Sequence, residues 1–152
     1  MIKRIVLFIV LNFTALAVGG LFTGKGVSSD WYQNLNQAPW TPPGWVFGFM
    51  WTLIMICFAI YMAYLVTSTT DRKKIIFLFG VQWILNVAWN PVFFGYQGVF
   101  AGLITISLLT ILVTYFLFRY KKELKLKSLL IVPYFIWLYI ATSLNAYILL
   151  YN

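Results

Sequence analysis

Three carboxamides in one long apolar run are the residues whose types and spacing best suit ligand chemistry. Gln82, Asn86 and Asn90 recur every four residues, so they lie on one face of a helix, with Trp89 and Phe93 beside them. A polar side chain in hydrocarbon costs free energy unless it finds a partner, which makes these amides candidates for a binding site. Hydrogen bonding between helices, typically worth under about 2 kcal/mol per contact, is the alternative and would suffice for Gln82 alone. It leaves the large rings on this face unexplained, because close helix packing favours small residues.

The final apolar run, residues 128–150, carries a second polar and aromatic face at similar spacing. Its members are Tyr134, Trp137, Leu138, Ala141, Leu144 and Asn145. Hydrogen bonding between helices would again suffice for Asn145 alone. A cavity lined by indole rings, with a few amides at one end, accounts for both faces. We therefore expect a pocket that holds a large, flat, apolar ligand by stacking and van der Waals contact.

The residue types that are missing exclude most kinds of catalysis. The sequence has no histidine, and its three acids, Asp30, Asp71 and Glu123, lie in predicted loops. No buried acid–base pair and no nucleophile with its base can therefore be assembled. Histidine-ligated haem is excluded as well, which leaves Cys57, tyrosines or methionines as conceivable iron ligands, and we predict no metal site. Ion-coupled transport usually employs an ionisable group at membrane depth, and none is available here.

The segment 31–51 concentrates aromatic residues and prolines between the first two apolar runs. Pro39, Pro42 and Pro43 remove backbone donors and fix φ, so a helix cannot continue through residues 38–42. We expect an ordered loop that opens directly onto a membrane helix at Pro43. Tryptophan and tyrosine favour the boundary between water and lipid, so an interfacial belt is the alternative explanation. Because the aromatic residues gather in one loop, we expect a set of them to contribute to the pocket: Trp31, Tyr32, Trp40, Phe47 and Trp51.

The composition indicates an integral membrane protein. Of the 152 residues, 62% are hydrophobic and only 9% are charged, and the apolar residues fall in runs long enough to cross a bilayer. A signal peptide is the alternative for the first run, but that run is long and lacks a small-x-small cleavage site, so we favour a retained helix. We predict a single domain, residues 1–152, that forms an all-α, five-transmembrane-helix bundle with helices at about 4–24, 43–66, 75–94, 99–118 and 128–150.

The basic residues that give the chain its net charge of +8 are distributed as this predicted topology requires. Five crossings put the N-terminus and the turns at 67–74 and 119–127 on one side, and only Lys25 among the basic residues lies on the other. By the positive-inside rule, we expect the N-terminus in the cytoplasm and the aromatic loop and C-terminus outside. The basic residues form no continuous stripe, so we predict no nucleic-acid partner.

These residues and their spacing resemble the TspO/MBR family, the bacterial relatives of the mitochondrial translocator protein. The resemblance spans nearly the whole chain. The matching residues are Trp31-Tyr32, Leu35, Pro39-Trp40-Thr41-Pro42-Pro43, Val46-Phe47-Gly48, Trp51, Asn86, Trp89, Phe93-Phe94-Gly95, Pro133-Tyr134, Trp137, Ala141 and Leu144-Asn145.

The resemblance implies a multi-pass protein of the bacterial cell membrane, usually a homodimer, that binds porphyrins and other apolar ligands in a pocket roofed by the first loop. The ligand implied is protoporphyrin IX or a related tetrapyrrole, and no cofactor is required. In members resembling this chain, Trp51 and Trp137 match the pair associated with light- and oxygen-dependent breakdown of protoporphyrin IX. The pocket residues implied are Trp51, Asn86, Trp89, Trp137, Ala141 and Leu144.

Three functional hypotheses follow from the sequence. The first is a tetrapyrrole-binding protein whose bound porphyrin is photo-oxidised, with Trp51 and Trp137 as the expected catalytic residues. The second is a transporter or stress sensor that binds the same ligands without chemistry. The third is a purely structural membrane subunit, which the aromatic and polar faces disfavour.

Overall fold

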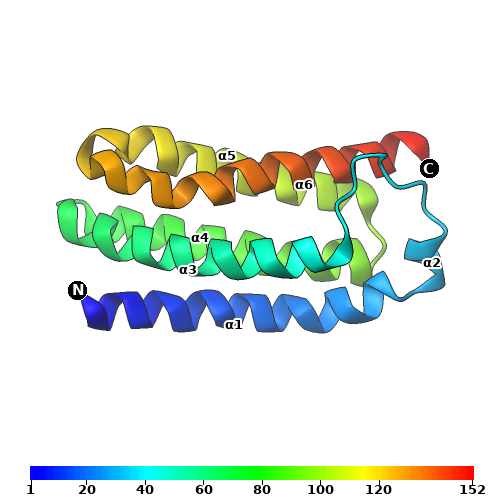
Figure 1. Ribbon diagram of the computed structural model, residues 1–152, viewed down its shortest axis with the longest axis horizontal. Helices are drawn as coiled ribbons and strands as arrows, with labels where there is room; N and C mark the ends of the chain where they lie inside the picture. Colours follow the sequence, from blue (N-terminus) through cyan, green and yellow to red (C-terminus); the bar gives the residue numbers. More distant parts are fainter.

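The computed structural model describes residues 1–152, and long α-helices account for most of the chain (Figure 1). The five long helices are α1 (Ile2–Val27), α3 (Gly44–Ser68), α4 (Arg72–Asn90), α5 (Val99–Leu124) and α6 (Val132–Tyr151). The short elements are α2 (Asp30–Gln33), a π-type turn η1 (Pro91–Gly95) and a 3₁₀ segment η2 (Lys125–Ile131). The prediction of an all-α protein is confirmed.

Four helical stretches are long and apolar enough to cross a membrane: Ile2–Val27, Gly44–Ser68, Arg72–Gly95 and Val99–Tyr151. The last of them has 53 residues and turns back at η2, so that α5 and α6 pack side by side as separate long helices (Figure 1). Each of the five predicted apolar runs therefore corresponds to one long helix, with differences at the ends. These helices are those expected of a multi-pass integral membrane protein.

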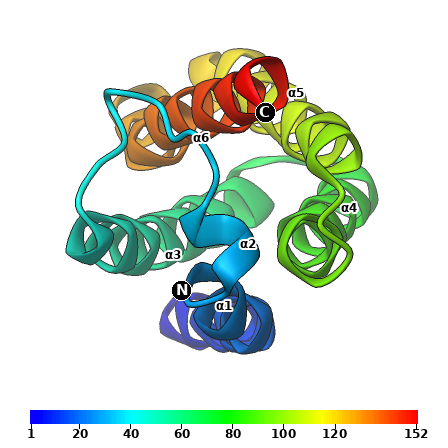
Figure 2. The same ribbon diagram turned by 90° about the vertical axis from the view of Figure 1, so that its right-hand side faces the viewer.

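The long helices form a closed ring (Figure 2). α1 packs on α3 and α4, α4 packs on α5, α5 packs on α6, and α6 packs back on α3. The short connections from α4 to α5 and from α5 to α6 each join antiparallel neighbours, whereas α1 lies between α3 and α4. α4 and α6 run in the same direction and face one another across the interior of the ring.

The two halves of this ring differ in packing. On α3, the buried residues run from Ile54 to Val66. No buried residue lies among residues 44–53, the part of α3 that follows the loop at 34–43. Phe58, Tyr61 and Phe116 pack together in the buried half, where Tyr61 Oη donates a hydrogen bond of 2.9 Å to the Phe116 carbonyl. Close van der Waals packing of such rings stabilises a membrane bundle. Lipid tails are as apolar as the side chains, so no hydrophobic effect drives the helices together. Within α3, the half near the loop is therefore the less tightly packed one.

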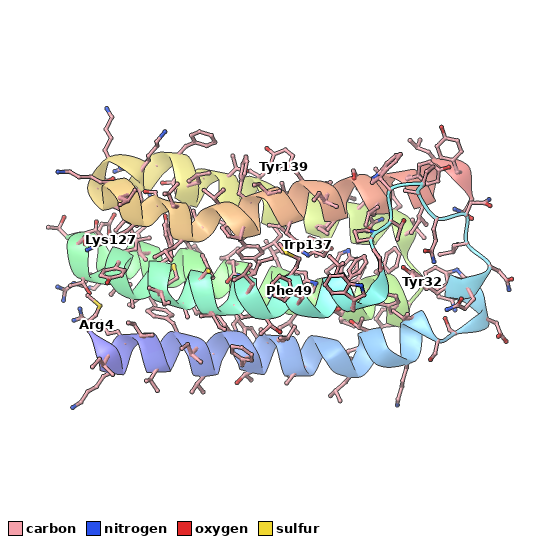
Figure 3. All side chains as sticks on the ribbon, viewed as in Figure 1. Arg4, Tyr32, Phe49, Lys127, Trp137 and Tyr139 are labelled. Atoms are coloured by element: carbon pink, nitrogen blue, oxygen red, sulfur yellow. The ribbon has the colours of Figure 1, made fainter.

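The basic residues gather at one end of the bundle. The N-terminus, the turn between α3 and α4, and η2 all lie at this end, whereas α2 and the C-terminus lie at the other (Figure 1). Arg4 and Lys127 mark the basic end and Tyr32 the opposite one (Figure 3). Arg4 Nη1 also donates a hydrogen bond of 2.7 Å to Thr67 Oγ1, which ties α1 to α3 there. The side of the membrane that each end faces stays a prediction.

Several helix boundaries differ from those predicted. α4 ends at Asn90 because Pro91 lacks a backbone donor, and residues 91–95 form the wider turn η1 instead of continuing a helix to 94. The predicted turn at 119–127 is wrong in its first half, since α5 continues through Leu124. α6 begins at Val132 and not at 128, so Pro133 occupies its first turn and produces no kink within the helix.

Candidate ligand-binding site

Two hydrogen bonds join α4 to α6 across the interior. Gln82 Nε2 donates to Tyr134 Oη at 2.8 Å, and Trp89 Nε1 donates to Asn145 Oδ1 at 3.1 Å. Asn145 also reaches α5, where its Nδ2 donates to the Val99 carbonyl at 3.0 Å. The amide face of α4 and the aromatic face of α6, each inferred from spacing alone, therefore point toward one another.

The stretch between these two bridges contains polar groups that have no hydrogen-bond partner in the chain. On α4 it contains Asn86, four residues after Gln82, and on α6 it contains Trp137 and Ala141. Trp137 is 2% exposed, and its indole Nε1 has no hydrogen-bond partner. Asn86 is 8% exposed, and its side-chain amide makes no hydrogen bond within the chain. The backbone carbonyl of Asn86 accepts a hydrogen bond from Asn90 Nδ2. A buried polar group without a partner costs about 1–3 kcal/mol, so this region has hydrogen-bonding capacity that the chain itself does not use.

α3 closes this stretch with two aromatic residues. The rings of Phe47 and Trp137 meet edge to face, with centroids 5.2 Å apart, and Trp51 approaches Tyr134 at 6.2 Å in a similar geometry. Phe47 and Trp51 are half-buried and lie in the half of α3 that has no fully buried residue. Trp137 points from α6 toward α3 in Figure 3. Two helices, α3 and α6, thus contribute the rings of this stretch, and Phe47 is the ring that packs against the Trp137 indole.

A second aromatic cluster lies at the loop end, where α2 packs against η1. Trp89 stacks on Phe93 at 5.0 Å, Trp31 meets Phe93 at 5.6 Å, and Tyr32 meets Phe94 at 5.4 Å. Burial among these rings raises the pKa of the Tyr32 hydroxyl. Trp89 belongs to this cluster and also to the α4–α6 bridge, so it connects the two aromatic groups.

Glycine allows the second cluster to form. A Cβ at Gly26 on α1 would collide with the ring of Phe94. Because glycine has no Cβ, the ring can lie directly against the α1 backbone. Phe94 stands in the matching motif but not among the predicted site residues, and nothing in its spacing indicated that it would pack on α1.

Trp40 lies apart from both clusters. It is 53% exposed, its Nε1 donates to Ser143 Oγ at 3.1 Å, and its ring meets Tyr147 at 5.4 Å. A further clasp joins the same loop to the end of α6, where Asn36 N donates to Asn152 Oδ1 at 2.8 Å and Asn152 Nδ2 donates to the Asn36 carbonyl at 3.3 Å. The loop therefore arches over the bundle and is fastened to α6 (Figure 1).

The remaining predicted residues divide between the site and the packing. Ala141 and Leu144 lie on the α6 face with Trp137, Ala141 half-buried and Leu144 buried. Asn90, the third amide of α4, turns toward α1 and accepts a hydrogen bond of 2.6 Å from Thr23 Oγ1. Helix packing accounts for Asn90, as the alternative explanation allowed.

Two cavities lie outside the stretch around Trp137. One of about 320 Å³ lies between the end of α1 and η1, and one of about 190 Å³ lies where α5 meets η2. Neither is lined by a predicted site residue. The rings of Phe47 and Trp137 pack on one another, so a ligand that enters between them would have to separate them.

The sequence pattern of the TspO/MBR family matches residues 7–151 of this chain. The chain is 34% identical over 137 residues to the tryptophan-rich protein TspO of Chlorobaculum tepidum, covering 88% of this chain and 86% of that protein. It is 30% identical to the tryptophan-rich sensory protein of Cereibacter sphaeroides, with 89% and 85% covered, and 29% identical to the human translocator protein, with the same coverage.

Proposed function

We propose that this chain, which belongs to the TspO/MBR family of membrane proteins, binds a tetrapyrrole of the protoporphyrin IX type between α3, α4 and α6. The observation that carries the proposal is the indole of Trp137, which is buried among rings and has an N–H without an acceptor. Two of its relatives are named as a sensory protein and as a translocator protein, and both names suit a protein that responds to or passes on a bound molecule.

The chemistry of the site favours a flat macrocycle with acceptor atoms. Phe47, Trp51 and Trp137 offer ring faces and edges, which attract a planar aromatic ligand through dispersion and quadrupole interactions. An indole N–H only donates, whereas the carboxamide of Asn86 both donates and accepts. A tetrapyrrole supplies a conjugated plane together with nitrogen and carboxylate acceptors, so it satisfies both kinds of group at once.

Binding requires the aromatic rings to move apart, and the packing indicates where that movement is least costly. Residues 44–53 of α3 include no buried residue, while the opposite half of α3 is firmly packed. The loop above this half is held by the Asn36–Asn152 clasp and by the Trp40–Ser143 hydrogen bond. We propose that these contacts open as the ligand enters and close over it afterwards.

A titration of the purified protein with protoporphyrin IX tests the binding. Porphyrin absorbance and tryptophan fluorescence would be followed in detergent or in lipid nanodiscs, for the native chain and for Trp137→Phe. The variant keeps an aromatic ring but removes the N–H together with the pyrrole part of the indole, so we expect Kd to rise at least about tenfold, the value of roughly one hydrogen bond. Trp45→Phe is the matched control, because Trp45 is 73% exposed on α3, and its affinity should stay at the native value. Equal affinities for all three proteins would refute the proposal.

Whether the bound porphyrin reacts is a separate question. In the chemical version of the proposal, light excites the porphyrin, O₂ is the oxidant, and Trp51 and Trp137 are the ring contacts that exchange an electron with it. In the carrier or sensor version, the ligand leaves unchanged. Binding at Trp137 is common to both versions.

A further inference from the structure

We propose that the corner where α5 meets η2 binds the phosphate of an anionic phospholipid. A cavity of about 190 Å³ lies at this corner, at the basic end of the bundle and far from the aromatic clusters. Its lining consists of Leu117, Phe118, Lys121, Lys125, Ser128, Leu129 and Val132. The wall thus combines two ammonium groups, one hydroxyl and an apolar surface.

Ser128 is the residue that points to a ligand. It is 4% exposed, and its Oγ has no hydrogen-bond partner in the chain. Buried hydroxyl groups are nearly always paired, so one that lines a cavity and lacks a partner indicates a group bound from outside. A serine hydroxyl next to lysines is a good donor to a phosphate oxygen.

The two lysines of this cavity are free to bind an anion. The nearest acid on the same helix, Glu123, is engaged by Arg119 at 2.9 Å, and the ammonium of Lys127 lies over the ring of Tyr64 at 4.0 Å. Lys121 and Lys125 have no ion-pair partner in the chain. They therefore leave two positive charges at the mouth of the cavity.

The backbone at Lys125 adopts an uncommon conformation. Its φ is 50°, a value that residues with a side chain seldom adopt, and it lies at the point where α5 gives way to η2. The tight turn brings Lys125, Lys121 and Ser128 around one space. A site of this kind is formed by the fold and is not simply a basic stretch of sequence.

The apolar walls favour a phospholipid over a free anion. Phe118 and Leu129 are 63% and 61% exposed, and both border the cavity. In the membrane these side chains would lie along an acyl chain, while the ammonium groups meet the phosphate. Basic pockets between membrane helices at the basic, cytoplasmic side are suited to anionic headgroups.

Native mass spectrometry of the detergent-solubilised chain with added phosphatidylglycerol or phosphatidylcholine tests this proposal. We expect the native chain to retain phosphatidylglycerol preferentially. Each lysine near a headgroup is worth about fivefold in affinity, so Lys121→Gln with Lys125→Gln should weaken binding about 25-fold. Lys3→Gln with Lys73→Gln removes the same charge at the same end but outside the cavity, and should retain native binding.

Ser128→Ala gives a test that does not change charge. It should weaken phosphatidylglycerol binding several-fold with no change in thermal stability, and it keeps the proposal testable if the double lysine variant fails to fold. Equal retention of the two lipids, or an equal loss in both lysine pairs, would overturn the proposal. So would full displacement of phosphatidylglycerol by millimolar inorganic phosphate, which would indicate a site for the free anion.

Discussion

Gln82 and Tyr134 are joined by a hydrogen bond of 2.8 Å between two helices that are far apart in sequence, while the other amide atom of Gln82, Oε1, is buried without a partner. The bond fixes the position of α4 relative to α6. It also bounds, at one end, the stretch that contains Asn86 on α4 and Trp137 on α6.

Removing either partner of this bond should destabilise the bundle modestly. Tyr134→Phe and Gln82→Leu should each lower the free energy of unfolding by about 1 kcal/mol, because hydrogen bonds between membrane helices are individually weak. The double variant should lose less than the sum of the two, since both changes remove the same interaction. Chemical unfolding in detergent, followed by circular dichroism, measures all three. Strict additivity would show that the bond contributes nothing.

Two neighbouring glycines of α1 should respond in opposite ways to the same substitution. Gly26→Ala forces the new Cβ into the ring of Phe94 and should lower Tm, because the ring has close neighbours on its other sides. Gly24→Ala meets nothing within 4 Å and should leave Tm unchanged or raise it, since alanine is favoured in a helix by about 1 kcal/mol. A thermal unfolding series would reveal the difference. Similar effects at both positions would contradict the packing of Phe94 on α1.

The loop between α2 and α3 should become mobile when its fastenings are removed. Asn152→Ala and Trp40→Phe remove the side-chain hydrogen bonds to the Asn36 backbone and to Ser143, so backbone amides of residues 35–41 should exchange with deuterium faster. Porphyrin should dissociate faster from the same variants if the loop covers the ligand. Asn34→Ala is the control, because Asn34 is exposed in the same loop and its side chain makes no contact with α6. Unchanged exchange in both variants would show that the loop is held by other contacts.

Illumination separates the chemical version of the proposed function from the carrier version. With protoporphyrin IX and oxygen, the chemical version predicts a spectral conversion that is slower in Trp51→Phe and Trp137→Phe than in the native chain. Trp83→Phe serves as the control, because Trp83 Nε1 is occupied by the carbonyl of Leu11. Porphyrin that bleaches at the same rate without protein would eliminate the chemical version. Porphyrin recovered unchanged would favour the carrier.

The sequence was informative where a pattern depends on helix geometry alone. The four-residue spacing of Gln82 and Asn86 and the spacing of Tyr134 and Trp137 predicted two faces, and the structure places these faces opposite one another. The length and apolarity of the runs likewise predicted the long helices. The register between α4 and α6 depends on the side chains of both helices, and it could be read only from the structure.

Features that depend on contacts between distant residues were not predictable. Asn90 shares its spacing with Asn86 but bonds to Thr23, because the approach of α1 at Gly19 brings a hydroxyl within reach. Trp40 was expected at the pocket, and Ser143 on α6 holds it at the surface instead. The cavity at Ser128 was missed as well, because a single serine among lysines has no periodic pattern.

The unpaired N–H of Trp137 makes this residue a natural spectroscopic reporter. An indole N–H without an acceptor vibrates at a higher frequency than one that is hydrogen-bonded, and resonance Raman spectroscopy distinguishes the two. Among the seven tryptophans, those at 40, 83 and 89 have acceptors in the chain, and the difference spectrum between the native chain and Trp137→Phe isolates the Trp137 band from those of Trp31, Trp45 and Trp51. Occupancy of the interior could therefore be followed in native membranes, without any attached dye.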